Sequence, residues 1–409
     1  MGRRSSQAAA SSMQVPRKKL RTPLGALIRL VAIVAGVLLV LFLIGGFYFS
    51  GVIRDDALEP PTNSAPEYEL EVVSVAGQTV TIQGPQDGAQ LNQNGVLGID
   101  WADGYIQSLE LESSIEQGGE RKDVRSLEPD AVAPVVGTKV TLDPFAFSGD
   151  PLAAMGIEYE NVLFPSESEV GSFPAWFIPG RSDTWAIIVH GKGAPLQESL
   201  RVIPILKDLG YPILVINYRN DVGQARDPSG YHRYGETEWV DLAAAVTYAQ
   251  ENGAVDHVLF GYSMGGAIVT SYLTQSPLRN FTKAAILDSP VLSFERTLDF
   301  RASRTDLPLL PIKVPGVLTQ FAKWISAWRF DINWSETDYL SQTNELHAPM
   351  LIFHGTKDTK VPYATSLEMA ELRPDIVTLV TTDANHVRSW NVDPEAYETA
   401  IKDFLAGLE

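Results

Sequence analysis

The most apolar stretch of the chain lies near its N-terminus. No charged residue occurs from Leu30 to Phe49, and at a helical rise of about 1.5 Å per residue a stretch of this length matches the hydrocarbon thickness of a bilayer. A buried core helix is seldom apolar on every face, so this pattern favours a membrane span. We therefore predict one transmembrane helix over residues 24–50.

The residues that flank this helix predict its orientation. Seven basic and no acidic residues occur up to Ile53, whereas Asp55, Asp56 and Glu59 follow it directly. The positive-inside rule then places the N-terminus in the cytoplasm and the remainder of the chain on the extracellular or periplasmic side. Aromatic residues 47–49 end the apolar run, which favours an uncleaved signal anchor over a signal peptide that ends in small residues.

The segments around the anchor differ in pattern. Residues 1–23 lack apolar periodicity and predict a disordered cytoplasmic tail. Residues 51–66 include three prolines and predict a linker that lifts the next segment off the membrane. Residues 67–150 hold short runs of alternating apolar and polar positions, with turns between them, and predict a small β-rich module. Because strand patterns carry no site chemistry, this module is either a packing and spacing unit or a substrate-binding unit.

From residue 157 to residue 409 continuous apolar strands alternate with amphipathic helices. The expected strands are Trp185–Val189, Pro212–Asn217, Val258–Phe260, Ala284–Leu287, Met350–His354 and Val377–Val380. The expected helices are Leu196–Leu209, Glu236–Glu251, Met264–Thr274, Tyr363–Glu371 and Pro394–Leu408. This alternation predicts the α/β class, with a mostly parallel sheet covered by helices on both faces.

Charge and composition narrow the function classes. The chain carries 32 basic against 50 acidic residues, a formal net charge of -18, and seven of the basic residues lie at or before the predicted anchor. An acidic surface of this kind disfavours nucleic acid as a partner. With no cysteine the chain has no thiolate nucleophile, and the histidines do not show the spacing of a zinc site. We therefore predict no metal, no cofactor and a nucleophile that is an oxygen or an amine.

One glycine-rich motif has the context that serine hydrolases require. Gly261-Tyr262-Ser263-Met264-Gly265 follows an apolar strand and opens a helix. A nucleophile lifted above the sheet by a sharp turn needs glycine two residues before and after it, because side chains there would collide. The motif also occurs by chance as a strand-to-helix turn without chemistry, so its meaning depends on partner residues.

Candidate partners occur later in the chain, in the order Ser, Asp, His. Asp358 lies in a loop after one predicted strand, and His386 follows the next strand, ahead of the last helix. Histidine can take the proton of the serine, and a carboxylate can fix the imidazole tautomer and stabilise its cation. Asp288, at the end of the strand Ala284–Leu287, is an alternative acid, but the loop context of Asp358 fits better.

Residues 157–409 resemble an α/β-hydrolase, and Val361-Pro362 after Asp358 resembles the alpha/beta hydrolase domain-containing and BEM46-like serine hydrolases. The resemblance implies that His190-Gly191-Lys192-Gly193 is the oxyanion loop, with the backbone N–H groups of Lys192 and Met264 as donors. Lys192 departs from the small or neutral residue common in such loops. Its side chain is expected to reach solvent or a substrate carboxylate.

The segment from about residue 291 to residue 346 lies where this fold carries a helical lid. Phe321, Trp324 and Trp328 recur at helical spacing within an apolar stripe. The stripe either packs on the core or roofs an apolar acyl pocket over Ser263. In the second case these three residues contact substrate.

Together these patterns predict a membrane-anchored extracytoplasmic serine hydrolase that cleaves a lipid or small acyl ester through Ser263, His386 and Asp358. A peptidase or a thioesterase would use the same three residues on an amide or a thioester. A non-catalytic, membrane-tethered binding module on the same fold is a third possibility. The chain length of the acyl group and the identity of the leaving group depend on pocket shape.

Overall fold

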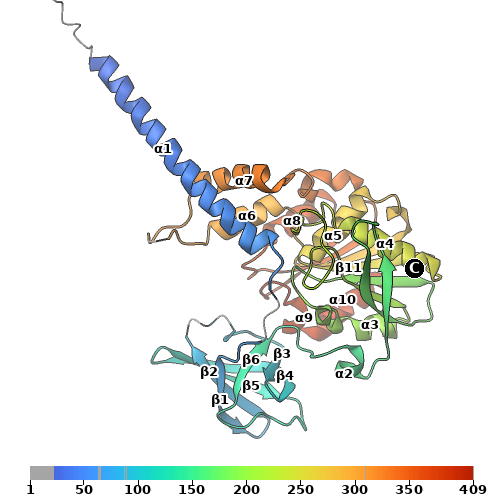
Figure 1. The fold of residues 1–409 in the computed structure, drawn as a ribbon. Helices are drawn as coiled ribbons and strands as arrows, with labels where there is room; N and C mark the ends of the chain where they lie inside the picture. Colours follow the sequence, from blue (N-terminus) through green and yellow to red (C-terminus); the bar gives the residue numbers. More distant parts are fainter. Residues whose placement is uncertain (1–22, 63–65, 87, 89, 309, 409) are drawn as a thin grey trace, which may run out of the picture.

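A computed structural model describes residues 23–62, 66–86, 88, 90–308 and 310–408. The chain begins with one long helix, α1 (Pro23–Ile53), which continues through a π-helical turn, η1 (Arg54–Leu58). Figure 1 shows α1 projecting from the rest of the molecule. The segment Gly25–Leu58 is apolar and long enough to cross a membrane. The tail predicted for residues 1–23 lies almost entirely outside the described residues.

The end of α1 is attached to the largest domain instead of being followed by a free spacer. Ala57 and Leu58 are fully or almost fully buried in its core. The backbone N–H of His232 donates to the carbonyl of Leu58 at 2.8 Å, and the Tyr234 hydroxyl donates to that of Ala57 at 3.2 Å. The expectation of a linker that starts at residue 51 is therefore wrong. The prolines suggested an extended spacer, but the side chains of Ala57 and Leu58, which precede them, are buried in the core of the large domain.

The β-rich module is a closed antiparallel barrel with strand order β1-β2-β5-β4-β3-β6. Its strands are β1 (Leu70–Ala76), β2 (Thr79–Pro85), β3 (Leu97–Trp101), β4 (Gly104–Gln117), β5 (Glu120–Leu127) and β6 (Lys139–Asp143). Alternate apolar residues fill the interior, including Val72, Val80 and Ile99, none of which is exposed. Closure removes free strand edges, which lets so small a module pack a core.

Strand β5 was not predicted from the pattern of apolar residues, because charged residues occupy its inward positions. Asp123 and Arg125 are buried side by side with Leu127 along one face of the strand. The Arg125 guanidinium donates to the Ser108 hydroxyl at 2.7 Å and to the Gln93 carbonyl at 2.7 Å. Burial lowers the pKa of Arg125 to about 10, against a smaller opposing effect of Asp123. Hydropathy alone cannot mark such a strand as internal.

The larger domain contains an eight-stranded sheet in the order β14-β13-β12-β11-β9-β10-β8-β7. Its strands are β7 (Glu160–Pro165), β8 (Ser172–Ile178), β9 (Thr184–Val189), β10 (Ile213–Ile216), β11 (Asp256–Tyr262), β12 (Thr282–Asp288), β13 (Met350–Gly355) and β14 (Val377–Thr382). Strands β9 to β14 pair in parallel, whereas β7 and β8 form an antiparallel edge. The predicted α/β-hydrolase fold class is confirmed, and the antiparallel edge is an addition to it.

Helices cover both faces of this sheet. One face carries η2 (Leu196–Arg201), α3 (Ile203–Asp208), α9 (Ser389–Val392) and α10 (Pro394–Ala406), and the other carries α4 (Trp239–Glu251), α5 (Met264–Gln275) and α8 (Tyr363–Leu372). The remaining helical elements are α2 (Pro151–Met155), η3 (Arg279–Phe281), α6 (Phe294–Ala302), α7 (Gly316–Phe330) and η4 (Tyr339–Glu345). The parallel strands are almost completely buried, as expected for a sheet enclosed on two sides.

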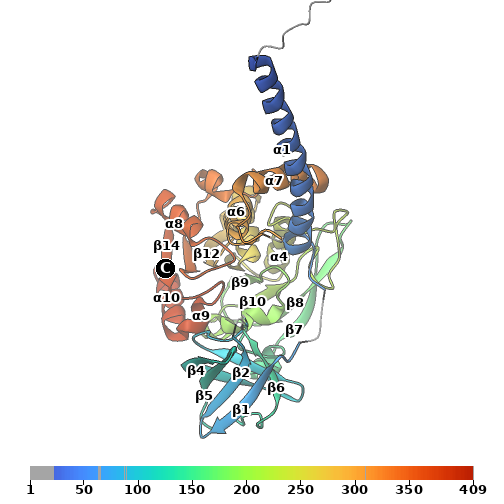
Figure 2. The same cartoon turned by 90° about the vertical axis from the view of Figure 1, so that its left-hand side faces the viewer.

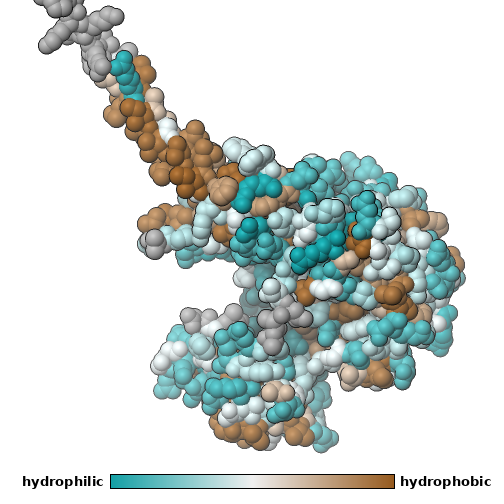
Figure 3. Space-filling model, viewed as in Figure 1, coloured by the Kyte–Doolittle hydropathy of each residue, from teal (hydrophilic) through white to brown (hydrophobic). Residues whose placement is uncertain are grey.

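Helix α7 packs along α1 (Figures 1 and 2). The rings of Phe42 and Phe321 are stacked with their centroids 5.7 Å apart. Gly46 allows this approach, because a Cβ at that position would lie 2.9 Å from the Cβ of Phe321. Next to α1, Figure 3 shows further apolar surface on the large domain. The insertion between β12 and β13 is therefore organised around the N-terminal helix.

The barrel is attached to the large domain at α9. The backbone N–H of Val96 donates to the Asn391 carbonyl at 2.7 Å, and the Asn391 amide donates to the carbonyls of Val96 at 2.6 Å and Pro144 at 2.9 Å. Gly95 lies against the same carbonyl, where a Cβ would be only 2.0 Å from the oxygen. This attachment brings the end of β6 beside the carboxyl ends of the parallel strands.

Candidate active site

Ser263 occupies the turn between β11 and α5. Its backbone has φ 50° and ψ -109°, a conformation that L-residues rarely adopt. A Cβ on Gly261 would lie 2.6 Å from the Gly265 carbonyl oxygen, and one on Gly265 would lie 2.2 Å from the Val189 carbonyl oxygen. Both glycines are therefore needed for the turn to close over the sheet, which explains the spacing of the motif.

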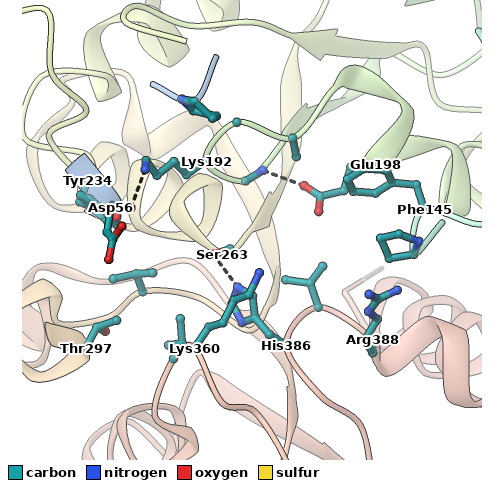
Figure 4. A pocket seen from close by; sticks show the side chains of 18 of the residues that line it. Asp56, Phe145, Lys192, Glu198, Tyr234, Ser263, Thr297, Lys360, His386 and Arg388 are labelled. Atoms are coloured by element: carbon teal, nitrogen blue, oxygen red, sulfur yellow. Dashed lines mark hydrogen bonds between the residues drawn. The ribbon is translucent and has the colours of Figure 1, made fainter. Parts of the chain in front are cut away.

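The structure brings Ser263, His386 and Asp358 into one hydrogen-bonded chain. Figure 4 shows the hydrogen bond between Ser263 and His386. His386 Nε2 lies 2.9 Å from Ser263 Oγ, and His386 Nδ1 lies 2.7 Å from Asp358 Oδ2. Asp358 follows β13, and His386 follows β14, so both reach Ser263 from the same edge of the sheet. The imidazole can thus accept the serine proton at one nitrogen while the carboxylate holds the other.

Asp358 is held as a carboxylate by several donors. Its Oδ1 accepts the backbone N–H groups of Lys360 at 2.7 Å and Val361 at 2.8 Å. His354 Nε2 lies 3.3 Å from its Oδ2. Burial opposes ionisation, but hydrogen bonds from His354 and His386 hold the pKa of Asp358 well below its usual range. The sequence pattern did not indicate that His354 lies close to Asp358.

Asp288 occupies a different environment and does not contact His386. Its carboxylate accepts hydrogen bonds from the Tyr397 hydroxyl at 3.2 Å and the Ser289 hydroxyl at 3.1 Å. Burial raises the pKa of Asp288 to about 6, with Arg201 acting in the opposite direction. Its backbone carbonyl accepts the N–H of Ser263 at 2.9 Å. Asp288 therefore supports the turn that carries Ser263.

The loop His190–Gly193 faces Ser263 from the end of β9. Gly191 approaches closely, since a Cβ there would lie 3.3 Å from the Ser263 Cβ. Its N–H is bound by Glu198 Oε2 at 2.7 Å, which leaves the following N–H, that of Lys192, as the candidate donor of this loop. The N–H of Met264 is the first of α5 and so has no partner within the helix. Met264 directly follows Ser263, and Lys192 directly follows Gly191, so the oxyanion role of these two N–H groups stays a prediction.

Buried polar residues that sequence reasoning did not find fix this loop. His190 Nε2 lies 3.3 Å from Asp221 Oδ2, and the ring of Tyr218 stacks on that of His190 with centroids 4.7 Å apart. The Tyr218 hydroxyl donates to the carbonyl of Gly191 at 3.1 Å. His232 lies nearby, fully buried, and burial lowers its pKa to about 3. It is a core residue and not part of the cavity mouth.

The side chain of Lys192 is half-buried and reaches the end of the N-terminal helix. Its Nζ donates to the carbonyl of Asp56, at the end of α1, at 2.8 Å (Figure 4). Burial and the positive charge of Arg301 lower the pKa of Lys192 to about 8, and Asp56 opposes this effect. The loop beside Ser263 is therefore tied directly to the junction between the N-terminal helix and the large domain.

The three predicted lid residues do not reach Ser263. Phe321 packs against α1, and Trp324 and Trp328 are 59% and 82% exposed. None of the three lines the cavity that contains Ser263. The prediction that they roof the acyl pocket thus differs from the structure, because α1 covers part of their stripe. Periodicity shows that a helix has an apolar face, but it does not show which element covers it.

A cavity of about 430 Å³ surrounds Ser263 and His386. Its wall includes Pro144 and Phe145 from the barrel and Asp56 from the end of α1, so all three parts of the chain contribute. Figure 3 shows the corresponding hollow between the barrel and the large domain. The basic residues in the wall are Lys192, Arg201, Arg301, Lys360 and Arg388, and the acidic ones are Asp56 and Glu198.

A second, apolar cavity of about 100 Å³ lies between α1, α6 and α7. Its wall is formed by Phe49, Val52, Ile53, Asp56, Ala57, Leu298, Arg301, Ala302, Thr305, Val314, Thr319 and Ala322. It shares Asp56 and Arg301 with the first cavity. Helix α7 therefore does border an apolar cavity near the site, but through Thr319 and Ala322.

Comparison with known proteins bears on the large domain. The sequence profile of the prolyl oligopeptidase family matches residues 198–407, slightly more than half of the chain. The chain belongs to the prolyl oligopeptidase family. Within this family domain lie Ser263, Asp358 and His386, whereas the barrel, the N-terminal helix and the His190–Gly193 loop precede the matched region.

Individual relatives of this family domain are distant. The acylamino-acid-releasing enzyme of Arabidopsis thaliana is 26% identical over 220 residues, which is 51% of this chain but only 28% of that protein. The uncharacterised protein YqkD of Bacillus subtilis is 21% identical over 227 residues, 54% of this chain and 71% of that protein. A solved esterase of Pyrococcus furiosus is 26% identical with a TM-score of 0.50, covering 63% of this chain and 95% of its own.

Proposed function

We propose that this protein is a membrane-anchored serine hydrolase that cleaves a carboxylic ester outside the cytoplasm. The observation that carries the proposal is the hydrogen-bonded chain from Ser263 Oγ through His386 to Asp358. Ser263 lies on a strained strand-to-helix turn, and Ser263 and His386 both line the same cavity. Serine is a poor nucleophile unless a base takes its proton, and His386 is the group placed to do so.

In the proposed reaction, Ser263 Oγ attacks the ester carbonyl carbon while its proton passes to His386 Nε2. The carbonyl oxygen becomes an oxyanion, and the N–H groups of Lys192 and Met264 stabilise it. His386 then gives the proton to the departing alkoxide, and an acyl-enzyme remains on Ser263. Water attacks the acyl group, again losing a proton to His386, and the carboxylic acid leaves as free Oγ–H is restored. Asp358 stabilises the imidazolium in both halves.

The comparisons support hydrolysis, and they are compatible with two types of substrate bond, an ester and an amide. The similarity to the Pyrococcus furiosus esterase, over nearly all of that protein, favours an ester. Membership of the prolyl oligopeptidase family and the similarity to an acylamino-acid-releasing enzyme favour an amide as the second candidate. A panel of matched ester, thioester and peptide substrates separates these candidates, because the same three residues serve all of them.

The proposal places α1 across a membrane with its N-terminus in the cytoplasm. Support comes from the apolar length of Gly25–Leu58 and from the basic residues before it. The close attachment of Ala57 and Leu58 to the domain would then hold the cavity near the membrane surface. N-terminal sequencing of the protein isolated from membranes tests the uncleaved anchor, and a mature N-terminus near Gly51 would contradict it.

The test of activity compares the full-length protein with Ser263→Ala in mild detergent, using a 4-nitrophenyl ester. We expect the variant to lose at least about 10³-fold in kcat, because only the oxyanion donors and binding remain. Thermal melting checks that the variant is folded. Turnover by Ser263→Ala equal to that of the unchanged protein would reject the proposed mechanism. Absence of turnover on the whole panel by the unchanged protein would instead favour a non-catalytic binding module.

A further inference from the structure

The wall of the catalytic cavity has the opposite charge to the protein as a whole. The chain has a formal net charge of -18, yet five basic side chains and only two acidic ones line the cavity around Ser263. The excess of positive charge in the cavity is therefore a local arrangement and does not follow from composition. A local field of this kind attracts ligands of opposite charge and raises their concentration at the site.

Two of the five basic residues have partners within the protein. Arg201 Nη2 lies 3.6 Å from Glu198 Oε1, and its Nη1 donates to the Val387 carbonyl at 2.9 Å. Lys192 donates to the carbonyl of Asp56. These contacts give both residues a structural role, although Lys192 keeps its positive charge at neutral pH.

The other three, Arg301, Lys360 and Arg388, have no carboxylate within 4.0 Å among the residues that the structure describes. The Nη1 atom of Arg388 is buried without a hydrogen-bond partner in the same part of the chain. A buried donor left unpaired costs free energy, so such groups in a cavity wall are the expected binding groups for a polar ligand.

The basic residues of the cavity wall also act on one another. Burial and then the charge of Arg201 lower the pKa of Arg388 to about 10, whereas Asp143 and Glu198 act in the opposite direction. Burial, followed by the charges of Arg388 and Arg301, lowers the pKa of Lys360, and Asp358 and Glu198 oppose this effect. Like charges that lie close together repel one another, and a bound anion relieves that repulsion.

The cations lie where they can contact a substrate of Ser263. Figure 4 shows Lys360 on one side of His386 and Arg388 on the other, with Phe145 of the barrel segment above Arg388. Lys360 belongs to the loop of Asp358, Arg388 follows His386 by two residues, and Arg301 belongs to α6. Three separate segments thus converge on the reacting atoms.

We propose that the catalytic cavity selects an ester that carries a carboxylate or phosphate group, bound by Arg301, Lys360 and Arg388. This inference rests on the proposed esterase function and adds the substrate class to it. The anionic group is either part of a small soluble ester or the headgroup of a lipid ester. The chemistry of recognition is the same for both sources, since arginine and lysine bind carboxylate and phosphate oxygens alike.

The test compares esters with and without an anionic group, using the full-length protein in mild detergent. In the soluble arm, mono(4-nitrophenyl) adipate is compared with its methyl ester, so that the acyl chain length and the 4-nitrophenyl leaving group are matched. In the lipid arm, phosphatidylglycerol is compared with diacylglycerol of the same acyl chains in mixed micelles, because diacylglycerol lacks the phosphate. We expect kcat/KM to favour the anionic ester at least tenfold in one arm, and that arm identifies the source. Equal kcat/KM in both arms would overturn the proposal.

Substitutions show whether these cations cause the preference. In Arg388→Gln and in Lys360→Gln, we expect the ratio of anionic to neutral kcat/KM to fall at least fivefold in the preferred arm. Lys357→Gln is the matched control, because Lys357 lies in the same loop as Lys360 but pairs with Asp383 and does not line the cavity. Its ratio should stay at that of the unchanged protein. An unchanged ratio in both test variants would overturn the assignment.

The two proposals fail in distinguishable ways. Because the selectivity is a ratio within one protein preparation, a partly unfolded variant lowers both rates and leaves the ratio unaffected. Loss of hydrolysis of both the charged and the neutral ester would count against the esterase function itself. Hydrolysis of both at equal rates would count against anion selection alone. Added salt provides a further check, since screening should lower the preference of the unchanged protein.

Discussion

The two cavities that share Asp56 and Arg301 differ in the charge and polarity of the rest of their walls. The larger contains Ser263 and His386, is lined by loops at the carboxyl ends of the strands, and carries an excess of basic side chains. The smaller is enclosed by the end of α1 together with α6 and α7, and its wall is mostly aliphatic. One therefore suits a reacting, charged group and the other suits a hydrocarbon group.

The difference indicates how one substrate could use both cavities. Burial of apolar surface contributes a favourable free energy of about 25 cal/mol per Å², and this contribution does not depend on the orientation of the buried group. Charged groups instead need placed partners. An amphiphilic ester would thus be oriented with its charge among the basic residues and its acyl chain toward the end of α1. The N-terminal helix α1 supplies Phe49, Val52 and Ile53 to the wall of the apolar cavity, so in this arrangement it would contact the acyl chain.

The largest effect on activity is expected from replacing the proposed acid at the polar cavity. Asp358→Asn should lower kcat by about 10³-fold to 10⁴-fold, because an amide cannot stabilise the imidazolium of His386 and favours the wrong tautomer. Steady-state kinetics on a neutral 4-nitrophenyl ester measures this loss. Asp288→Asn is the comparison variant, since Asp288 does not contact His386. A larger loss in Asp288→Asn than in Asp358→Asn would reverse the assignment of the acid.

The three residues proposed for catalysis could be predicted from local sequence motifs. Ser263, Asp358 and His386 were found because each follows an expected strand in a short motif, and parallel strands deliver such loops to one edge. The cations could not be found in this way. Arg301 comes from α6, and its convergence with Lys360 and Arg388 depends on how the insertion folds over the sheet.

Other features were hidden for different physical reasons. The periodicity of α7 predicted an apolar face, yet its partner is α1, more than 270 residues earlier in the sequence. Strand β5 was missed because the charged residues Asp123 and Arg125 replace apolar residues inside the barrel. Ala57 and Leu58 looked like part of a proline-rich linker, although they are buried. In each case, the deciding contact lies far along the chain.

A smaller effect is expected from filling the apolar cavity. Ala322→Phe places a ring in its wall and should lower kcat/KM for long-chain 4-nitrophenyl esters about tenfold relative to the acetate. The chain-length profile at constant detergent measures this ratio. Ala327→Phe is the control, because Ala327 lies on the same helix outside the cavity wall. Melting temperatures of both variants detect overpacking, which commonly costs about 1–3 kcal/mol. An unaltered profile in Ala322→Phe would separate the apolar cavity from substrate binding.

The smallest effect is expected at the border of the two cavities, from the titration of Lys192. Its pKa is lowered to about 8, so its charge is mostly present at pH 7 and mostly lost at pH 9. The preference for the anionic ester should therefore fall about threefold over this interval. Lys192→Arg keeps its charge throughout and should remove the dependence. The charged groups that act on Lys192 are Arg301, Asp56, Asp221 and Glu59.

The control for this pH profile is the neutral ester measured in the same buffers, because titration of the catalytic groups affects both substrates equally. A preference that falls equally in Lys192→Arg would assign the pH dependence to another group. A preference that does not change between pH 7 and pH 9 in the unchanged protein would contradict the role given to the Lys192 charge.

The central claim is that Ser263 is the nucleophile, and covalent labelling tests it most directly. The full-length protein is treated with a fluorophosphonate, digested, and the modified peptide is identified by mass spectrometry, with Ser263→Ala treated in parallel. The account predicts one phosphonylated site, Ser263, and no labelling of the variant. An unlabelled protein, or an adduct on another serine that persists in Ser263→Ala, would contradict it.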